Sequence, residues 1–149
     1  MKESLTKVLR DSGFAGGAST WHKDGSEAIL VVNLQKSQYG QQYYVNLGVW
    51  LNALGAAKKP KENQCHVQIR ATSLPADGVK RFDQALNLED PAMTSDQREA
   101  VIEEFMRGDA IPFLESCGTL NGIRSALDGG KLARALVYGS VRDLIAAKG

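Results

Sequence analysis

The stretch QQYYVNLGVWLN, residues 41–52, decides the fold, because apolar residues occupy every second position from Tyr43 to Leu51. A β-strand points successive side chains to opposite faces, so a period of two is the pattern of a strand with one buried face. The stretch is therefore predicted to be a strand. Its apolar face carries Tyr43, Val45, Leu47, Val49 and Leu51.

Segments on either side of this strand repeat the pattern and are joined by short connections. An irregular strand is expected around residues 17–23, a second strand over 28–36 and a fourth over 64–72. Asp24-Gly25 is a hairpin signal between the first two. Connections of hairpin length imply antiparallel pairing, since parallel strands need a longer crossover. The sequence thus predicts a four-stranded antiparallel β-meander.

Helical spacing appears before and after this sheet. Residues 3–12 predict a short amphipathic helix, and Gly13 sits where a C-cap glycine belongs. Residues 74–94 show no sustained period and are expected to be an irregular link. Thr94 and Gln97 form a predicted capping box. The helices expected from there on cover 94–108, 111–118, 119–130 and 132–145.

Strands first and helices afterwards indicate an α+β fold, with one helix before the sheet and three to four after it, packed on one sheet face. We expect a single domain over 1–149, made of a helix plus antiparallel sheet (3–73) and a helical half (94–147). Apolar residues occur on both faces of the second strand at Ile29 to Val32. The sequence therefore leaves open which face the helices cover.

Composition excludes several classes of protein. The chain has 149 residues, 43% hydrophobic and 23% charged, which is ordinary globular usage. Its net charge of +1 argues against a nucleic-acid partner, whose binding needs clustered positive charge. The one basic run, Lys58-Lys59-Pro60-Lys61, is interpreted as a solvated loop.

The N-terminus, the apolar runs and the two cysteines indicate the compartment. No apolar run is long enough to span a membrane, and no secretory signal is seen, so a cytoplasmic location without a membrane partner is expected. Cys65 and Cys117 are then expected to be reduced thiols that pack as small hydrophobes.

The second face of the sheet is the candidate binding surface. If Leu47 faces the helices, alternation turns a set of amides, aromatics, a histidine and an arginine the other way. Polar residues on one face are also what any half-solvated antiparallel sheet needs, so a plain solvated face is the alternative. The candidate face consists of Gln35, Ser37, Tyr44, Asn46, Trp50, His66, Gln68 and Arg70.

No catalytic residue, cofactor site or metal site is predicted. His22 and His66 are the only histidines, and neither lies in a nucleophile motif. The histidines and cysteines are scattered without metal-ligand spacing. The paired acids Glu103-Glu104 point about 100° apart on a helix and are interpreted as a solvated helix face.

Several segments together resemble a bacterial family catalogued as domain of unknown function 4304. They are Gly13-Phe14, Trp21 with the turn Asp24-Gly25, Val32-Asn33-Leu34-Gln35-Lys36-Ser37, Tyr44-Val45-Asn46-Leu47-Gly48-Val49, Arg70 and Phe113-Leu114-Glu115. The resemblance is strongest over residues 5–72. It implies a small stand-alone protein, and it carries over no activity, cofactor or catalytic residue.

Two functional hypotheses follow, and a third possibility is self-association through the sheet edge or the Trp50 face. The first is a non-enzymatic module that binds an unidentified protein partner, with Trp50 and Tyr44 as apolar contacts and Arg70 and Gln35 fixing orientation. The alternative is a small enzyme or small-molecule binder that holds an anionic ligand at Arg70, whose planar fork suits a carboxylate or phosphate, with His66 nearby as acid or base.

Overall fold

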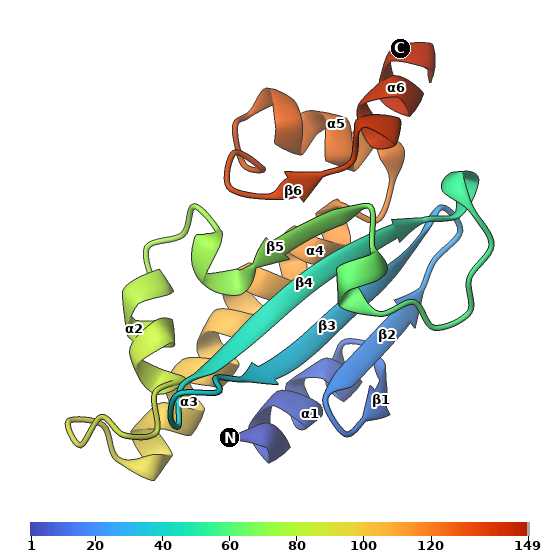
Figure 1. Cartoon of the computed structure of the whole chain (residues 1–149). Helices are drawn as coiled ribbons and strands as arrows, with labels where there is room; N and C mark the ends of the chain where they lie inside the picture. Colours follow the sequence, from blue (N-terminus) through green and yellow to red (C-terminus); the bar gives the residue numbers. More distant parts are fainter. Residues whose placement is uncertain (149) are drawn as a thin grey trace.

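The structure is a computed structural model that describes residues 1–148, and it has a single antiparallel sheet with helices (Figure 1). The α+β class is confirmed. The predicted count of four strands is wrong, because the sheet has six strands in sequential order. The strands are β1 Ala15–Gly17, β2 Thr20–Asp24, β3 Ala28–Lys36, β4 Tyr43–Leu51, β5 Val67–Arg70 and β6 Leu136–Val137.

The first predicted strand, around 17–23, is two strands joined by a tight turn. β1 pairs antiparallel with β2, with Gly17 opposite Thr20. The turn places Ala18 at φ 52°. A Cβ on Gly16 would lie 2.4 Å from the carbonyl oxygen of Thr20, so only glycine fits there. Glycine-rich sequence therefore formed a hairpin where one irregular strand was expected.

The last predicted helix, 132–145, is also wrong in its first half. Leu136 and Val137 form β6, which pairs antiparallel with β5, and the Tyr138 N–H donates to the carbonyl oxygen of His66 at 2.9 Å. The helix α6 begins only at Gly139 and runs to Lys148. Pairing with β6 satisfies backbone groups on the edge of β5, and this long-range gain overrides local helical spacing.

The remaining helices are α1 Lys2–Asp11, α2 Val79–Ala85, α3 Ser95–Phe105, α4 Ile111–Ser116 and α5 Leu120–Asp128. The helix α2 lies inside the predicted irregular link, where buried Phe82, Ala85 and Leu86 have helical spacing. No break occurs at Gly108, since a π-helical turn over Met106–Ala110 joins α3 to α4. None of the helices within residues 1–148 combines the length and apolarity needed to cross a membrane.

The predicted helix ends are largely confirmed. Thr94 Oγ1 accepts from the Gln97 N–H at 3.2 Å, and Gln97 Oε1 accepts from the Thr94 N–H at 2.9 Å. Thr119 Oγ1 likewise accepts from the Gly122 N–H at the start of α5. Gly13 follows α1 with φ 91°, the left-handed conformation that favours glycine after a helix.

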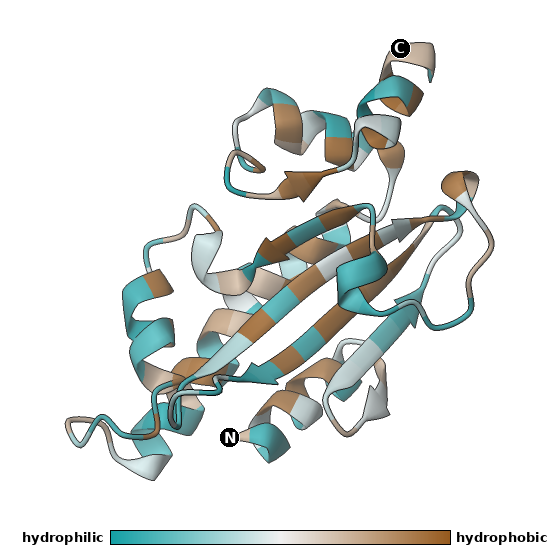
Figure 2. Cartoon of the chain, viewed as in Figure 1, coloured by the Kyte–Doolittle hydropathy of each residue, from teal (hydrophilic) through white to brown (hydrophobic). Residues whose placement is uncertain are grey.

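The helices cover the sheet face that carries Val45, Leu47, Val49 and Leu51, which answers the question that the sequence left open. Figure 2 shows the resulting alternation of hydrophobic and hydrophilic residues along β3 and β4. Aromatic residues join the helices to each other, and the rings of Phe82 and Phe105 stack at 4.2 Å. The opposite side of the sheet, called the open face below, faces the viewer in Figure 1.

A buried arginine closes the connection between α2 and α3. The Arg98 guanidinium donates to the carbonyl oxygens of Ala85 at 2.7 Å and Asn87 at 2.8 Å, and more weakly to those of Gln84, Asp90 and Met93. Carbonyl groups at a helix C-terminus carry partial negative charge, so they solvate the cation in place of water. Arg98 therefore fixes the segment after α2.

Candidate functional site

A row of polar side chains crosses four strands of the open face. The register pairs Thr20 with Asn33, Asn33 with Asn46, and Asn46 with Arg70. Directly paired residues of antiparallel strands point to the same face, with Cβ atoms about 5 Å apart. The row therefore runs from β2 to β5 across the sheet.

The amides of this row hold one another in fixed orientations. Asn46 is only 6% exposed, and its Nδ2 donates to Asn33 Oδ1 at 3.1 Å and to Gln35 Oε1 at 2.9 Å. Asn33 Nδ2 in turn donates to Thr20 Oγ1 at 3.1 Å. Both Nδ2 hydrogens of Asn46 are thus engaged, and no hydrogen bond within residues 1–148 uses its Oδ1.

Arg70 ends the row and stacks on an aromatic ring. Its guanidinium carbon lies 3.9 Å from the centroid of the Tyr44 ring, a cation–π contact. The ion pairs within residues 1–148 join the Met1 amino group to Glu99, Lys23 to Glu115 and Arg107 to Asp11, so none uses Arg70. The stack positions the guanidinium and leaves its N–H groups available.

Thr20, Asn33 and Asn46 of this row form the floor of a polar hollow of about 400 Å³, and Arg70 stands beside it. One wall is formed by Lys61, Glu62 and Asn63, which lie in the chain segment between β4 and β5. Burial raises the pKa of the Glu62 carboxyl, and the positive charge of Arg70 partly opposes this effect. The hollow is lined by Thr20, Asn33, Gln35, Asn46, Lys61, Glu62 and Asn63.

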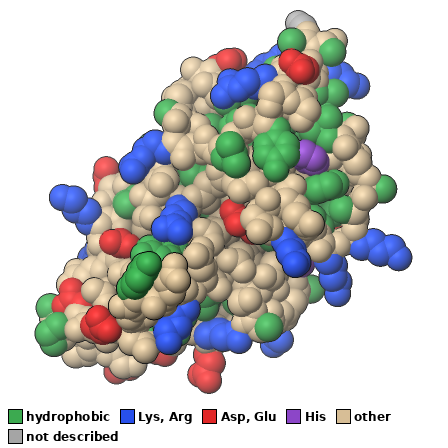
Figure 3. All heavy atoms as spheres, in the orientation of Figure 1, with side chains coloured by type: hydrophobic (Ala, Val, Ile, Leu, Met, Phe, Trp, Pro, Cys, Tyr) green, Lys and Arg blue, Asp and Glu red, His purple; other side chains and the backbone are tan. Residues whose placement is uncertain are grey.

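Residues 52–66, called the strap below, cover the other half of the open face. They enclose a small second core of Ile29, Val31 and Cys65, against which Trp50 packs. Gly48 makes this approach possible, because a Cβ there would lie 2.8 Å from Cys65 Sγ. The space-filling view shows hydrophobic side chains beside a histidine on this face (Figure 3).

Side chains of the sheet hold the strap by hydrogen bonds to its backbone. Trp50 Nε1 donates to the carbonyl oxygen of Gly55 at 2.9 Å, and Gln68 Nε2 donates to that of Cys65 at 2.9 Å. His22 Nε2 lies 2.7 Å from the carbonyl oxygen of Pro60. Lys58, Lys59 and Lys61 are exposed, as expected for a solvated run, while Pro60 is buried.

The expectation that His66 is exposed is wrong. Its side chain is 7% exposed, between the rings of Trp50 at 4.3 Å and Tyr138 at 5.7 Å. Its Nδ1 accepts a hydrogen bond from the Leu51 N–H at 3.0 Å, and burial lowers its pKa. Arg70 lies four positions further along the chain, about 13 Å in an extended conformation, so the two groups do not meet over one ligand atom.

The structure divides the predicted binding face into two groups. Gln35, Tyr44, Asn46 and Arg70 lie together in and beside the polar hollow. Trp50 and Gln68 hydrogen-bond to the strap, and His66, at the end of the strap, is buried between the rings of Trp50 and Tyr138. Ser37 lies beyond the end of β3, where its Oγ accepts from the Tyr39 N–H, so it belongs to neither group.

Thr20 and Glu62 are among the hollow residues that the predicted face did not include. Thr20 begins β2, whereas the predicted strand started near residue 17. In the hairpin that turns at Gly25, Asp24 pairs with Ile29, and this register puts Thr20 opposite Asn33. Glu62 lies in the strap, and no periodic signal could place a loop residue above the sheet. The packing of Cys65 over Gly48 and the hydrogen bonds that hold the strap bring it there.

Metal-ligating and thiol groups were the other candidates for chemistry on this face. Within residues 1–148, no group of three or more His, Cys, Asp and Glu side chains could hold a metal ion. Cys65 and Cys117 are free and buried. Burial, with the nearby charge of Glu62, raises the pKa of the Cys65 thiol to about 12, so it is not a nucleophile at neutral pH.

These features define an α+β protein whose antiparallel sheet is covered by helices on one face and carries a half-covered polar surface on the other. The chain belongs to the family described as Domain of unknown function (DUF4304), whose model matches residues 5–116. The match includes the sheet strands β1 to β5, the strap and the polar hollow, and it ends in α4. No curated protein and no solved structure matches the chain.

Proposed function

We propose that this protein is a non-enzymatic interaction module, and that the uncovered half of the open face binds a partner protein. The supporting observation is the polar hollow: hydrogen-bonded Asn46 beside an Arg70 that is stacked on Tyr44, where residues 1–148 offer neither a partner for Asn46 Oδ1 nor an ion pair for Arg70. Arginine and tyrosine are enriched among residues that dominate binding energy at protein interfaces.

The hollow suits a polypeptide better than a compact small molecule. Small-molecule sites are mostly enclosed and apolar, with a few polar groups. The residues that line this hollow are all polar or charged. Asparagine and glutamine side chains offer the same donor and acceptor as a peptide group, so they pair well with a partner's backbone.

The alternative, an enzyme or small-molecule binder with Arg70 and His66 acting together, has less support. His66 is enclosed by Trp50 and Tyr138, and its Nδ1 is already occupied. Arg70 by itself remains a group that can bind an anion. We therefore keep Arg70 as a binding residue and assign no catalytic role to His66.

Affinity capture from the native host lysate tests the proposal. Wild-type protein is compared with a Gln35, Asn46 and Arg70 triple alanine variant whose fold is confirmed by circular dichroism and NMR. A matched control carries alanine at Lys2, Lys7 and Arg10, exposed residues of α1. We expect a partner retained by wild type and control and lost by the triple variant. Equal capture by all three proteins would contradict a partner site at this face.

A further inference from the structure

The unused polar groups of the hollow specify what a bound segment must offer. Both hydrogens of Asn46 Nδ2 are engaged by Asn33 and Gln35, so the group that Asn46 presents to the hollow is the acceptor Oδ1. A ligand must therefore supply an N–H at this point. A peptide backbone supplies one at every residue except proline.

Beside Asn46, Arg70 requires a hydrogen-bond acceptor from the ligand. Arg70 is the register partner of Asn46, so the two side chains emerge side by side on the open face. Its guanidinium has donors only, and the Tyr44 ring holds one of its faces. A carboxylate that meets the edge of the guanidinium can accept two parallel N–H bonds, the strongest neutralising contact available to arginine.

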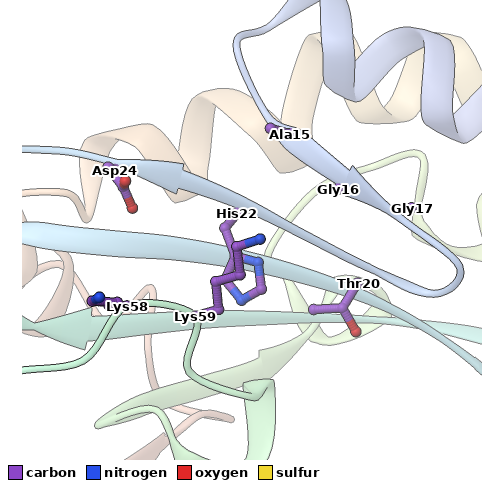
Figure 4. Close-up of a pocket in the computed structure, with 8 residues that line it drawn as sticks. All are labelled: Ala15, Gly16, Gly17, Thr20, His22, Asp24, Lys58 and Lys59. Carbon is purple, nitrogen blue, oxygen red and sulfur yellow. The ribbon is translucent and has the colours of Figure 1, made fainter.

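The other end of the row is rimmed by lysines. Lys61 lines the polar hollow, and a second hollow of about 320 Å³ shares Thr20 with it. This second hollow is lined by Lys58 and Lys59 of the strap together with Thr20 and His22 of β2 (Figure 4). The acids that line the two hollows are Asp24 and Glu62. Three lysines and Arg70 outnumber them, so the whole surface favours an acidic ligand.

The length of the row sets the spacing of the acids. From β5 to β2 there are three strand-to-strand steps, about 14 Å at 4.8 Å each. An extended chain advances about 3.3 Å per residue, so about four residues cover this distance.

We propose that the open face binds an extended acidic segment of the partner, with one carboxylate in the fork of Arg70 and a second acid about four residues away against the strap lysines. The backbone N–H beside the first acid donates to Asn46 Oδ1. This inference rests on the proposed function and names the chemistry of the partner. A bound carboxylate disfavours ionisation of Glu62, whose burial already raises its pKa.

Titration of ¹⁵N-labelled protein with defined peptides tests the inference. The probe is the acetylated and amidated pentapeptide Glu-Thr-Ala-Thr-Glu, with Gln-Thr-Ala-Thr-Gln as its neutral match and Thr-Glu-Glu-Ala-Thr as its spacing match. We expect saturable shifts of the Asn46 side-chain amide and the Arg70 Nε–H with the first peptide. The neutral match should bind about tenfold more weakly, as should the first peptide to Arg70→Gln.

Controls separate this result from general attraction. Lys7→Gln removes one positive charge on α1, away from the hollow, and should bind the first peptide as wild type does. Equal binding of the acidic and neutral peptides would overturn the inference. So would tighter binding of a single-stranded RNA pentamer at the same residues. If no peptide binds while the triple variant still loses a captured partner, the inference fails and the proposed function stands.

Discussion

The two halves of the open face begin with the same backbone and end with different surfaces. On β3 and β4, the half near Trp50 presents apolar Ile29 and Val31 and is covered by the strap. The half near Asn46 presents amides and remains open as the polar hollow. The strap removes the apolar surface of the first half from water. A segment placed over the amide row would instead have to supply a hydrogen-bond partner for every donor and acceptor. The chain therefore covers one half itself and leaves the other accessible.

Trp50 is the largest side chain of the covered half, so its removal should cause the largest loss in the free energy of unfolding. Trp50→Ala deletes the ring that packs on the second core and the hydrogen bond to Gly55. We expect a loss of about 3 kcal/mol in the free energy of unfolding, at the low end for tryptophan because the side chain is only partly buried. Urea unfolding measures it. Tyr44→Ala, on the open half, should lose about 1 kcal/mol or less, and equal losses would mean that the halves do not differ.

Gly48 marks the point where the strap touches the sheet. Gly48→Ala places a Cβ 2.8 Å from Cys65 Sγ and should cost about 2 kcal/mol, because the strap must move outward. Replacing Cys65 with alanine as well should recover about 1 kcal/mol, since the double variant removes the clashing sulfur. Additive losses in this double-mutant cycle would show that the contact does not hold the strap down.

The amide network of the open half should contribute less than the second core. Asn46→Ala removes two hydrogen bonds and leaves Asn33 Oδ1 and Gln35 Oε1 beside a hollow that admits water. We expect a loss of about 1 kcal/mol, because the freed acceptors can be hydrated. Thermal and urea unfolding give the value. A loss as large as that of Trp50→Ala would indicate that this half is also part of the core.

Acid should weaken the covered half through His66. Burial lowers its pKa below the ordinary 6.5, so below about pH 6.5 the unfolded chain binds a proton that the folded chain does not. Stability is therefore full above this pH and falls as the pH decreases toward the folded-state pKa. His66→Asn keeps an acceptor for the Leu51 N–H and cannot titrate. Unfolding free energies measured from pH 7.5 to pH 5 should fall more steeply for wild type than for this variant, and parallel curves would refute the assignment.

Arg70 should show the smallest effect on stability and the largest on binding. Its guanidinium is exposed and has no ion pair within residues 1–148. Arg70→Gln should change the free energy of unfolding by less than about 0.5 kcal/mol, as exposed substitutions usually do. The same variant should lose most of the captured partner. A large loss of stability would make Arg70 a structural residue of the open half.

Several elements of the fold could be predicted from the sequence because their signals are local. Alternation over residues 41–52 gave β4, the run 28–36 matched β3, and the capping box at Thr94 gave the start of α3. The elements that were missed have weak local signals. The strand β6 contains only Leu136 and Val137, and it exists because the edge of β5 needs a partner.

The orientation of the candidate residues was predicted in the same way, by strand parity. Gln35, Tyr44, Asn46 and Arg70 do lie together. Parity says which way a side chain points and nothing about what lies above it, so His66 and Trp50 were expected to be exposed. A loop without periodicity packs on Trp50 and is held by hydrogen bonds to Trp50, Gln68 and His22, while His66 is buried between Trp50 and Tyr138.

The sequence by itself determined the α+β class, the meander of β2 to β5, the family and the polar character of one sheet face. These follow from side-chain periodicity and turn chemistry, which act between residues close in the chain. Tertiary structure alone decided that the strap covers one half of that face, that Glu62 joins the hollow and that β6 completes the sheet. Those outcomes depend on contacts between distant residues, in which burial of Cys65 over Gly48 and pairing with β5 outweigh local preference.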